Sequence, residues 1–167
     1  RGGIYLVGST NNIINNTIQN SGCGIYFDSA GLNNTLSGNQ VNTSAGQSYV
    51  LYGTLVSHYN QSIDSSNLAE GKPVNYTFNG QNLVINHNNS FGQVICGWCN
   101  NVTYDDVNVS GGDGINLFYT SNSTISNSKI NTSVGYGIYL YQQSHNNNIV
   151  NNSINTTGTI GYGIYLF

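Results

Sequence analysis

The phrase Gly-Ile-Tyr-Leu stands at residues 3–6 and returns as Gly-Ile-Tyr-Phe at residues 24–27, 21 residues later. Four related phrases follow at spacings of 22, 23 and 26 residues, and they begin at Gly92, Gly114, Gly137 and Gly163. A weaker copy, Ser-Tyr-Val-Leu, occupies residues 48–51. Self-similarity at a short, nearly fixed period is the sequence signature of a solenoid.

An Asn-rich phrase with two apolar residues five apart follows each first phrase, at residues 11–18, 33–41, 122–130 and 147–154. Each unit therefore contains three short strands that end at Gly or Asn, residues that tolerate the positive φ of a sharp corner. Three strands and three corners in about 22 residues form one coil of a parallel β-helix. The period of two places Ile and Leu inside and Tyr outside. Inward Asn residues at the corners are expected to form ladders from coil to coil.

The low content of charged residues argues against several classes of binding partner. Charged residues make up 5% of the 167 residues, and the net charge of −3 includes only three Lys and Arg. Nucleic acids and anionic membranes need basic clusters, so neither is an expected partner. No apolar run reaches the ~18 residues of a membrane span. Low charge favours an extracellular or cell-surface location, and N-glycosylation sequons begin at Asn15, Asn33, Asn42, Asn60, Asn75, Asn88, Asn101, Asn108, Asn122, Asn131, Asn151 and Asn155.

Four stretches resemble one known family: Ile63-Asp64-Ser65-Ser66-Asn67, Gly71-Lys72-Pro73-Val74, Gly92-Gln93-Val94-Ile95 and Cys99-Asn100-Asn101-Val102-Thr103. They are similar to the NosD-like (CASH-domain) right-handed parallel β-helix family, as found in archaeal cell-surface proteins. The resemblance implies a right-handed helix and a secreted, surface-attached solenoid, and the repeat spacing of 21–26 residues predicts about seven coils. The family takes its name from a copper-related maturation protein, but most relatives with this pattern have no known activity.

Residues 1–167 are expected to form a single segment of a longer solenoid. Residues 54–91 break the phrase spacing, so we expect irregular coils there, with a loop near residues 65–73. The loop either only decorates the helix or binds a ligand, because loops on rigid scaffolds often carry function.

The cysteines offer one short motif, Cys96-Gly97-Trp98-Cys99. Structural zinc needs a second ligand pair, and redox pairs sit at helix N-termini, whereas a strand and a corner are predicted here. Two interpretations remain: Cys99 is a small buried hydrophobe, or Cys96 and Cys99 flank a corner and form a local disulfide. Cys23 is expected to be an unpaired buried thiol.

Metal and catalytic sites have little support. Copper sites use Met, His and Cys clusters, but the chain lacks Met and its three histidines lie in separate coils, at His58, His87 and His145. Calcium held by Asp105, Asp106 and Asp113 is disfavoured because adjacent Asp residues on a strand point to opposite faces. Glycosidases need two facing carboxylates, and lyases need a base beside a carboxylate. The six acidic and three basic residues of this chain are scattered along the sequence and do not predict such a pair. We therefore expect no cofactor and no catalytic residues.

The leading hypothesis is a non-enzymatic extracellular structural module of a surface layer, sheath, fibre or adhesin. The alternative is a β-helix that binds or cleaves carbohydrate. One predicted surface is an outward aromatic column that stacks on sugar rings, contacts a neighbouring molecule or only protects the sheet, and it comprises Tyr5, Tyr26, Tyr49, Tyr139 and Tyr165. The chain begins and ends inside a coil phrase, so the expected partners are further coils of its own chain or copies of itself.

Overall fold

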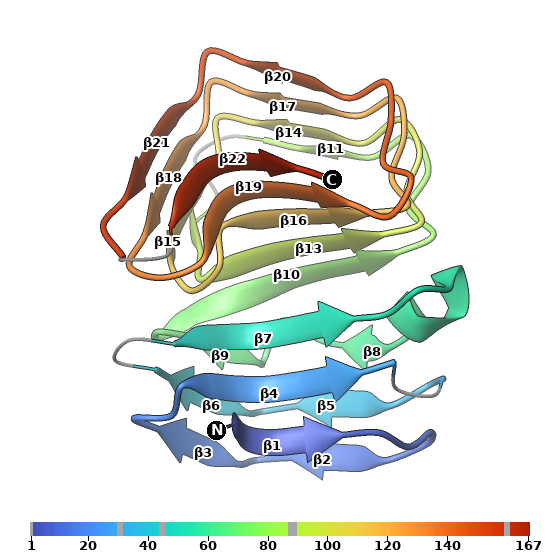
Figure 1. Ribbon diagram of the computed structural model, residues 1–167, viewed down its shortest axis with the longest axis vertical. Helices are drawn as coiled ribbons and strands as arrows, with labels where there is room; N and C mark the ends of the chain where they lie inside the picture. The colour runs from blue at the N-terminus through green and yellow to red at the C-terminus, as the bar shows by residue number, and fades with distance from the viewer. Residues whose placement is uncertain (1, 30–31, 44–45, 87–89, 159–160) are drawn as a thin grey trace.

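The computed structural model describes residues 2–29, 32–43, 46–86, 90–158 and 161–167 (Figure 1). Almost all of its regular structure is short parallel strands, and the predicted β-helix of about seven coils is confirmed. The coils form two consecutive stacks (Figure 1). We call β1–β9 the N-terminal stack and β10–β22 the C-terminal stack.

Three sheets form the walls of the N-terminal stack. The first contains β1 (Gly2–Leu6), β4 (Cys23–Asp28) and β7 (Gln47–Tyr52). The second contains β2 (Asn12–Ile14), β5 (Thr35–Ser37) and β8 (Ser62–Ile63), and the third contains β3 (Thr17–Gln19), β6 (Gln40–Asn42) and β9 (Leu68–Ala69). The 3-10 helix η1 (Val56–Tyr59) lies between β7 and β8.

The C-terminal stack repeats this plan. Its first wall contains β10 (Lys72–Phe78), β13 (Gln93–Gly97), β16 (Ile115–Phe118), β19 (Tyr136–Tyr141) and β22 (Tyr162–Leu166). The second contains β11 (Val84–Ile85), β14 (Thr103–Asp105), β17 (Thr124–Ser126) and β20 (Asn148–Val150). The third contains β12 (Ser90–Phe91), β15 (Asn108–Gly111), β18 (Lys129–Thr132) and β21 (Ser153–Thr156).

A β-hairpin joins the two stacks. Strand β10 pairs antiparallel with β9, with Lys72 opposite Ala69, whereas the other paired strands are parallel. The turn residues Glu70 and Gly71 both have positive φ, of 50° and 77°, as the common two-residue hairpin turn requires. The third wall of the N-terminal stack thus continues into the first wall of the C-terminal stack.

The outer face of the first C-terminal wall covers the end of the N-terminal stack. Strand β7 ends its sheet, and the Gln93 side chain takes the place of a further strand: its Oε1 accepts from the Tyr49 N–H at 3.1 Å, and its Nε2 donates to the Tyr49 carbonyl at 2.8 Å. The Tyr59 ring of η1 stacks on Phe118 with centroids 4.6 Å apart. Ile95 and Phe118 therefore belong to the N-terminal core, separate from the core inside the C-terminal coils.

One corner rule recurs through both stacks: a residue with positive φ is followed by an inward residue whose side chain bonds to the preceding coil. Gly38 (φ 64°) precedes Asn39, whose Oδ1 accepts from the Asn16 N–H at 3.0 Å. Asn122 (φ 54°) precedes Ser123, whose Oγ accepts from the Val102 N–H at 3.0 Å. The expected Asn ladders are present in the N-terminal stack, and Ser or Thr takes many of the same positions in the C-terminal stack.

Candidate functional site

The predicted tyrosine column is only partly formed. Tyr5 and Tyr26 face outward and stack with centroids 5.4 Å apart, at an interplanar angle of 8°. Tyr49 does not belong to the column: it lies opposite Ile25 in the register and is buried, with only 1% of its surface exposed. Its ring fills the end of the N-terminal core, and its hydroxyl lies 3.2 Å from the Asn39 carbonyl. Val50 takes the outward position instead, and the single column predicted from the sequence is wrong.

The other two tyrosines belong to an aromatic cluster on the outer face of β19 and β22. We call this cluster the aromatic terrace, and it comprises Tyr136, Tyr139, Tyr141, Tyr162, Tyr165 and Phe167. Tyr136 lies 4.6 Å from Tyr139 and 5.0 Å from Tyr165, measured between ring centroids. Tyr162 and Phe167 are exposed. The terrace extends the wall whose neighbouring strands, β13 and β16, are buried against the N-terminal stack.

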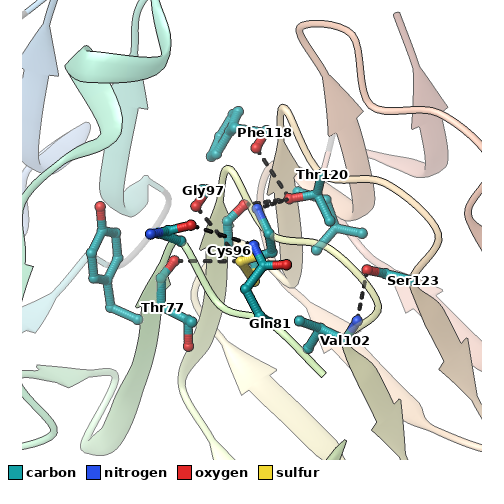
Figure 2. Close-up of a disulfide and its surroundings, with 12 residues drawn as sticks. Thr77, Gln81, Cys96, Gly97, Val102, Phe118, Thr120 and Ser123 are labelled. Atoms are coloured by element: carbon teal, nitrogen blue, oxygen red, sulfur yellow. Dashed lines mark hydrogen bonds between the residues drawn. A yellow bond between two sulfur atoms is a disulfide. The ribbon is translucent and has the colours of Figure 1, made fainter. Parts of the chain in front are cut away.

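Cys96 and Cys99 form a disulfide in the structure (Figure 2), with Cα atoms 6.1 Å apart. Both cysteines are buried, because Trp98 between them has a φ of 54° and turns the chain at the corner. Cys99 occupies the inward corner position, and its N–H donates to Thr120 Oγ1 at 3.4 Å. Thr120 Oγ1 in turn donates to the Cys96 carbonyl at 3.1 Å, which fixes the corner to the next coil. Cys23 is free and half-buried.

Trp98 is the unusual residue of this corner. Bulky residues rarely adopt positive φ, and such conformations cost about 1–3 kcal/mol when they are held in place. The indole is nevertheless 48% exposed, and it rests against the Phe78 ring with centroids 5.9 Å apart. Tyr119, one coil further on, also has a positive φ of 50°, and its hydroxyl donates to the Thr54 carbonyl at 2.6 Å.

A groove of about 350 Å³ lies along this edge, where the corners of the C-terminal stack meet η1. We call it the corner groove, and its lining comprises Val56, Gln81, Trp98, Cys99, Asn100, Tyr119, Ser121, Gln143 and His145. Gln81, Asn100, Ser121 and His145 come from four successive coils and follow one another through parallel bridges. Polar side chains therefore repeat along the groove at the coil spacing of about 4.8 Å, beside an exposed indole.

A family model described as a right-handed beta helix region matches residues 75–167. The chain belongs to this right-handed beta helix family. The match starts inside β10 and covers nearly the whole C-terminal stack, which includes the terrace and every lining residue of the corner groove except Val56. Searches of curated proteins and of solved structures found no significant match. Members of the family include enzymes, binding proteins and proteins without catalysis, so the fold alone does not assign an activity to this β-helix.

The acidic residues of this β-helix do not come together as a metal site. Asp105 Oδ1 accepts from Ser126 Oγ and from Asn127 Nδ2, both at 2.7 Å, and Asp106 follows it at an exposed corner. Asp113 lies at a different corner, where it contacts Gln47. The described residues contain no group of three or more His, Cys, Asp or Glu side chains that could hold a metal ion.

The two described histidines, His58 and His145, are also separate. His58 Nδ1 accepts from the Thr54 N–H at 3.1 Å within the N-terminal stack, and His145 lines the corner groove. His87 and the sequon residue Asn88 lie outside the described residues. Within the ranges described, no helix has the length and apolarity of a membrane span.

The corner rule explains several sequons of this β-helix. In Asn33-Asn34-Thr35 the first residue has positive φ, the second is the inward ladder residue, and the third is exposed at the start of β5. The first residue of the sequons that begin at Asn15, Asn101, Asn122 and Asn151 also has positive φ, although the second residue of the Asn101 sequon is the apolar Val102. These sequons follow from the fold, so their abundance is weak evidence for glycosylation. No sequence motif predicts the corner groove, although Trp98 stands before an inward residue, as the corner asparagines do.

Proposed function

We propose that this β-helix is a non-enzymatic, extracellular module of a cell-surface structure, and that its corner groove binds a neutral polysaccharide. The observation that carries the proposal is the exposed indole of Trp98 beside uncharged polar groups that repeat from coil to coil. The proposal combines the surface-module hypothesis with carbohydrate binding, as in an adhesin.

The chemistry of the groove favours a sugar over a charged ligand. An indole face packs against the C–H face of a pyranose ring, and amides and hydroxyls exchange hydrogen bonds with sugar hydroxyls. The lining contains no Asp, Glu, Lys or Arg, and it contains one histidine, His145. An extended polysaccharide repeats at a spacing close to that of the coils, so each polar side chain along the groove meets a successive sugar unit.

The floor of the groove is rigid, which reduces the entropy lost on binding. The disulfide closes the Trp98 corner, and Thr120 ties that corner to the next coil. A disulfide also supports an oxidising, extracellular location, because cytosolic thiols are kept reduced. Membership of the NosD-like group of surface proteins is part of the same proposal.

The aromatic terrace supports a second surface for the same ligand class. Its rings contact one another, its tyrosines combine an apolar ring with a phenolic hydroxyl, and Tyr suits such mixed surfaces. It has fewer amide groups than the corner groove and is therefore the weaker candidate.

The test is binding of the purified protein to an array of neutral and acidic polysaccharides, with Trp98→Gly and Tyr162→Ala compared in parallel. Glycine suits the positive φ at residue 98, so the first variant removes the indole and leaves the corner intact. We expect Trp98→Gly to lose at least tenfold in affinity for neutral polysaccharide and Tyr162→Ala to lose little. Equal binding by all three proteins would contradict the assignment to the groove.

The same samples test the absence of catalysis through assays for new reducing ends and unsaturated products. We expect neither to accumulate. Turnover that disappears in Asp105→Ala or Asp113→Ala would replace the binding proposal with an enzymatic one.

A further inference from the structure

Asp113 is an acid buried between the two stacks. It lies at the corner between β15 and β16, and only 3% of its surface is exposed. Its Oδ1 accepts from Gln47 Nε2 of the N-terminal stack at 3.2 Å. The fit is tight, because a Cβ atom on Gly135 would lie 1.8 Å from the same Oδ1. Asp113 therefore joins β7 of one stack to the first wall of the other.

Within the described part of the chain, the lining of the cavity around Asp113 contains no positively charged side chain. The carboxyl group lines a cavity of about 30 Å³, and the other lining residues are Gln47, Tyr49, Val50, Leu51, Asn116, Phe118, Tyr136 and Tyr139. None of them is Lys, Arg or His. A carboxylate formed there would be desolvated without an ion-pair partner, which is costly.

The titratable groups that face Asp113 are uncharged near neutral pH. Burial, and then the charge of Asp113, raises the pKa of the Cys23 thiol on β4 to about 11, while the positive charge of the N-terminus offsets part of the rise. Burial raises the pKa of Tyr136 on β19 as well, with further contributions from Tyr165 and Asp113. Tyr49 and Tyr139 also line the cavity, and burial raises the pKa of each.

We propose that Asp113 makes the junction between the two stacks pH-sensitive: the junction is closed while the carboxyl group is protonated and opens more readily once it ionises. Asp113 lies at the contact that joins the stacks, accepts a hydrogen bond from Gln47 across the junction, and faces neutral side chains in the described lining of its cavity.

The pKa of Asp113 sets the pH range and the sign. Burial raises this pKa from the ordinary 3.8 to about 7, and the hydrogen bond from Gln47 offsets only part of the rise. The closed junction therefore holds the proton more tightly than an open, solvated one does. The junction loses stability as pH rises from about 4 to about 7, and the loss is complete above pH 7. This is the reverse of the behaviour of a salt-bridged aspartate.

The test is hydrogen exchange of the amides of β7 and β16, corrected for the intrinsic dependence of exchange on pH. For the wild-type protein we expect the opening equilibrium constant at the junction to rise roughly a hundredfold between pH 5 and pH 8. Asp113→Asn keeps an acceptor for Gln47 and cannot ionise, so its opening constant should not change over that range. Amides of β17 and β20, far from the junction along the coil, serve as an internal control.

Gln47→Leu provides an independent variant. Without the donor that favours the carboxylate, the midpoint of the wild-type transition should move to higher pH. Equal pH profiles in the wild-type protein and in Asp113→Asn would overturn the proposal, as would a Gln47→Leu midpoint that is unchanged or lower.

Discussion

The ladder Asn16–Asn39–Asn67 allows a quantitative test of the corner rule. Asn39 is fully buried, and its side chain makes contacts with both neighbouring coils. Its Oδ1 accepts from the backbone N–H and the Nδ2 of Asn16, both at 3.0 Å. Its Nδ2 donates to the Ile13 carbonyl at 2.7 Å and to Asn67 Oδ1 at 2.8 Å.

Replacing Asn39 with alanine removes these four hydrogen bonds, although Asn67 Oδ1 keeps the bond from the backbone N–H of residue 39 at 3.3 Å and the exposed Asn16 Nδ2 still donates to the Ile14 carbonyl at 3.2 Å. A hydrogen bond contributes about 1 kcal/mol net, and a buried group left unsatisfied costs about 1–3 kcal/mol. We therefore expect Asn39→Ala to lower the free energy of unfolding by about 4 kcal/mol. Exposed Asn12 in β2 provides the matched control, and Asn12→Ala should stay within about 0.5 kcal/mol of the wild-type protein.

The assay is urea denaturation followed by far-ultraviolet circular dichroism, with both variants and the wild-type protein at one pH. A loss below about 1 kcal/mol for Asn39→Ala would show that the ladder contributes little. Equal losses of unfolding free energy in Asn39→Ala and Asn12→Ala would show that the buried position of Asn39 is irrelevant. Either result would refute the reasoning.

Three further comparisons test other parts of the structure. Gln93→Ala leaves the N–H and carbonyl of Tyr49 without partners and should cost about 2–3 kcal/mol in denaturation; an unchanged midpoint would contradict the capping role of Gln93. Replacing Cys96 and Cys99 together with Ala opens a very short loop and should cost about 2 kcal/mol, with no effect if the thiols are already reduced in the native protein. Trp98→Gly should be about 1 kcal/mol more stable than Trp98→Ala, because φ is positive there, and the opposite order would argue against that backbone conformation.

The coil architecture could be predicted because side-chain direction in a strand depends only on the period of two. Ile25 and Phe27 are buried and Tyr26 lies outward, as the phrase at residues 24–27 predicts. The phrase at residues 48–51 misled the prediction because its tyrosine stands one place earlier in the register, opposite Ile25. Period alone cannot reveal that a large ring is needed to fill the end of a stack.

The junction and the corner groove could not be predicted, because both depend on backbone conformation at single residues. A two-residue turn at Glu70 and Gly71 reverses the chain, whereas the sequence indicated only a loop near residues 65–73. A strand through Cys96 and Cys99 would place their side chains on opposite faces, but the positive φ of Trp98 brings both inside. That change of direction also exposes the indole.

Trp98 is the only tryptophan in the chain, so its fluorescence reports directly on the corner groove. The most direct measurement is titration of the native protein with neutral oligosaccharides of increasing length, followed by tryptophan emission. We predict a saturable shift of the emission to shorter wavelength, with affinity that increases until the oligosaccharide spans the coils that line the groove. Saturable binding by calorimetry with unchanged tryptophan emission, or no binding at any length, would contradict the account.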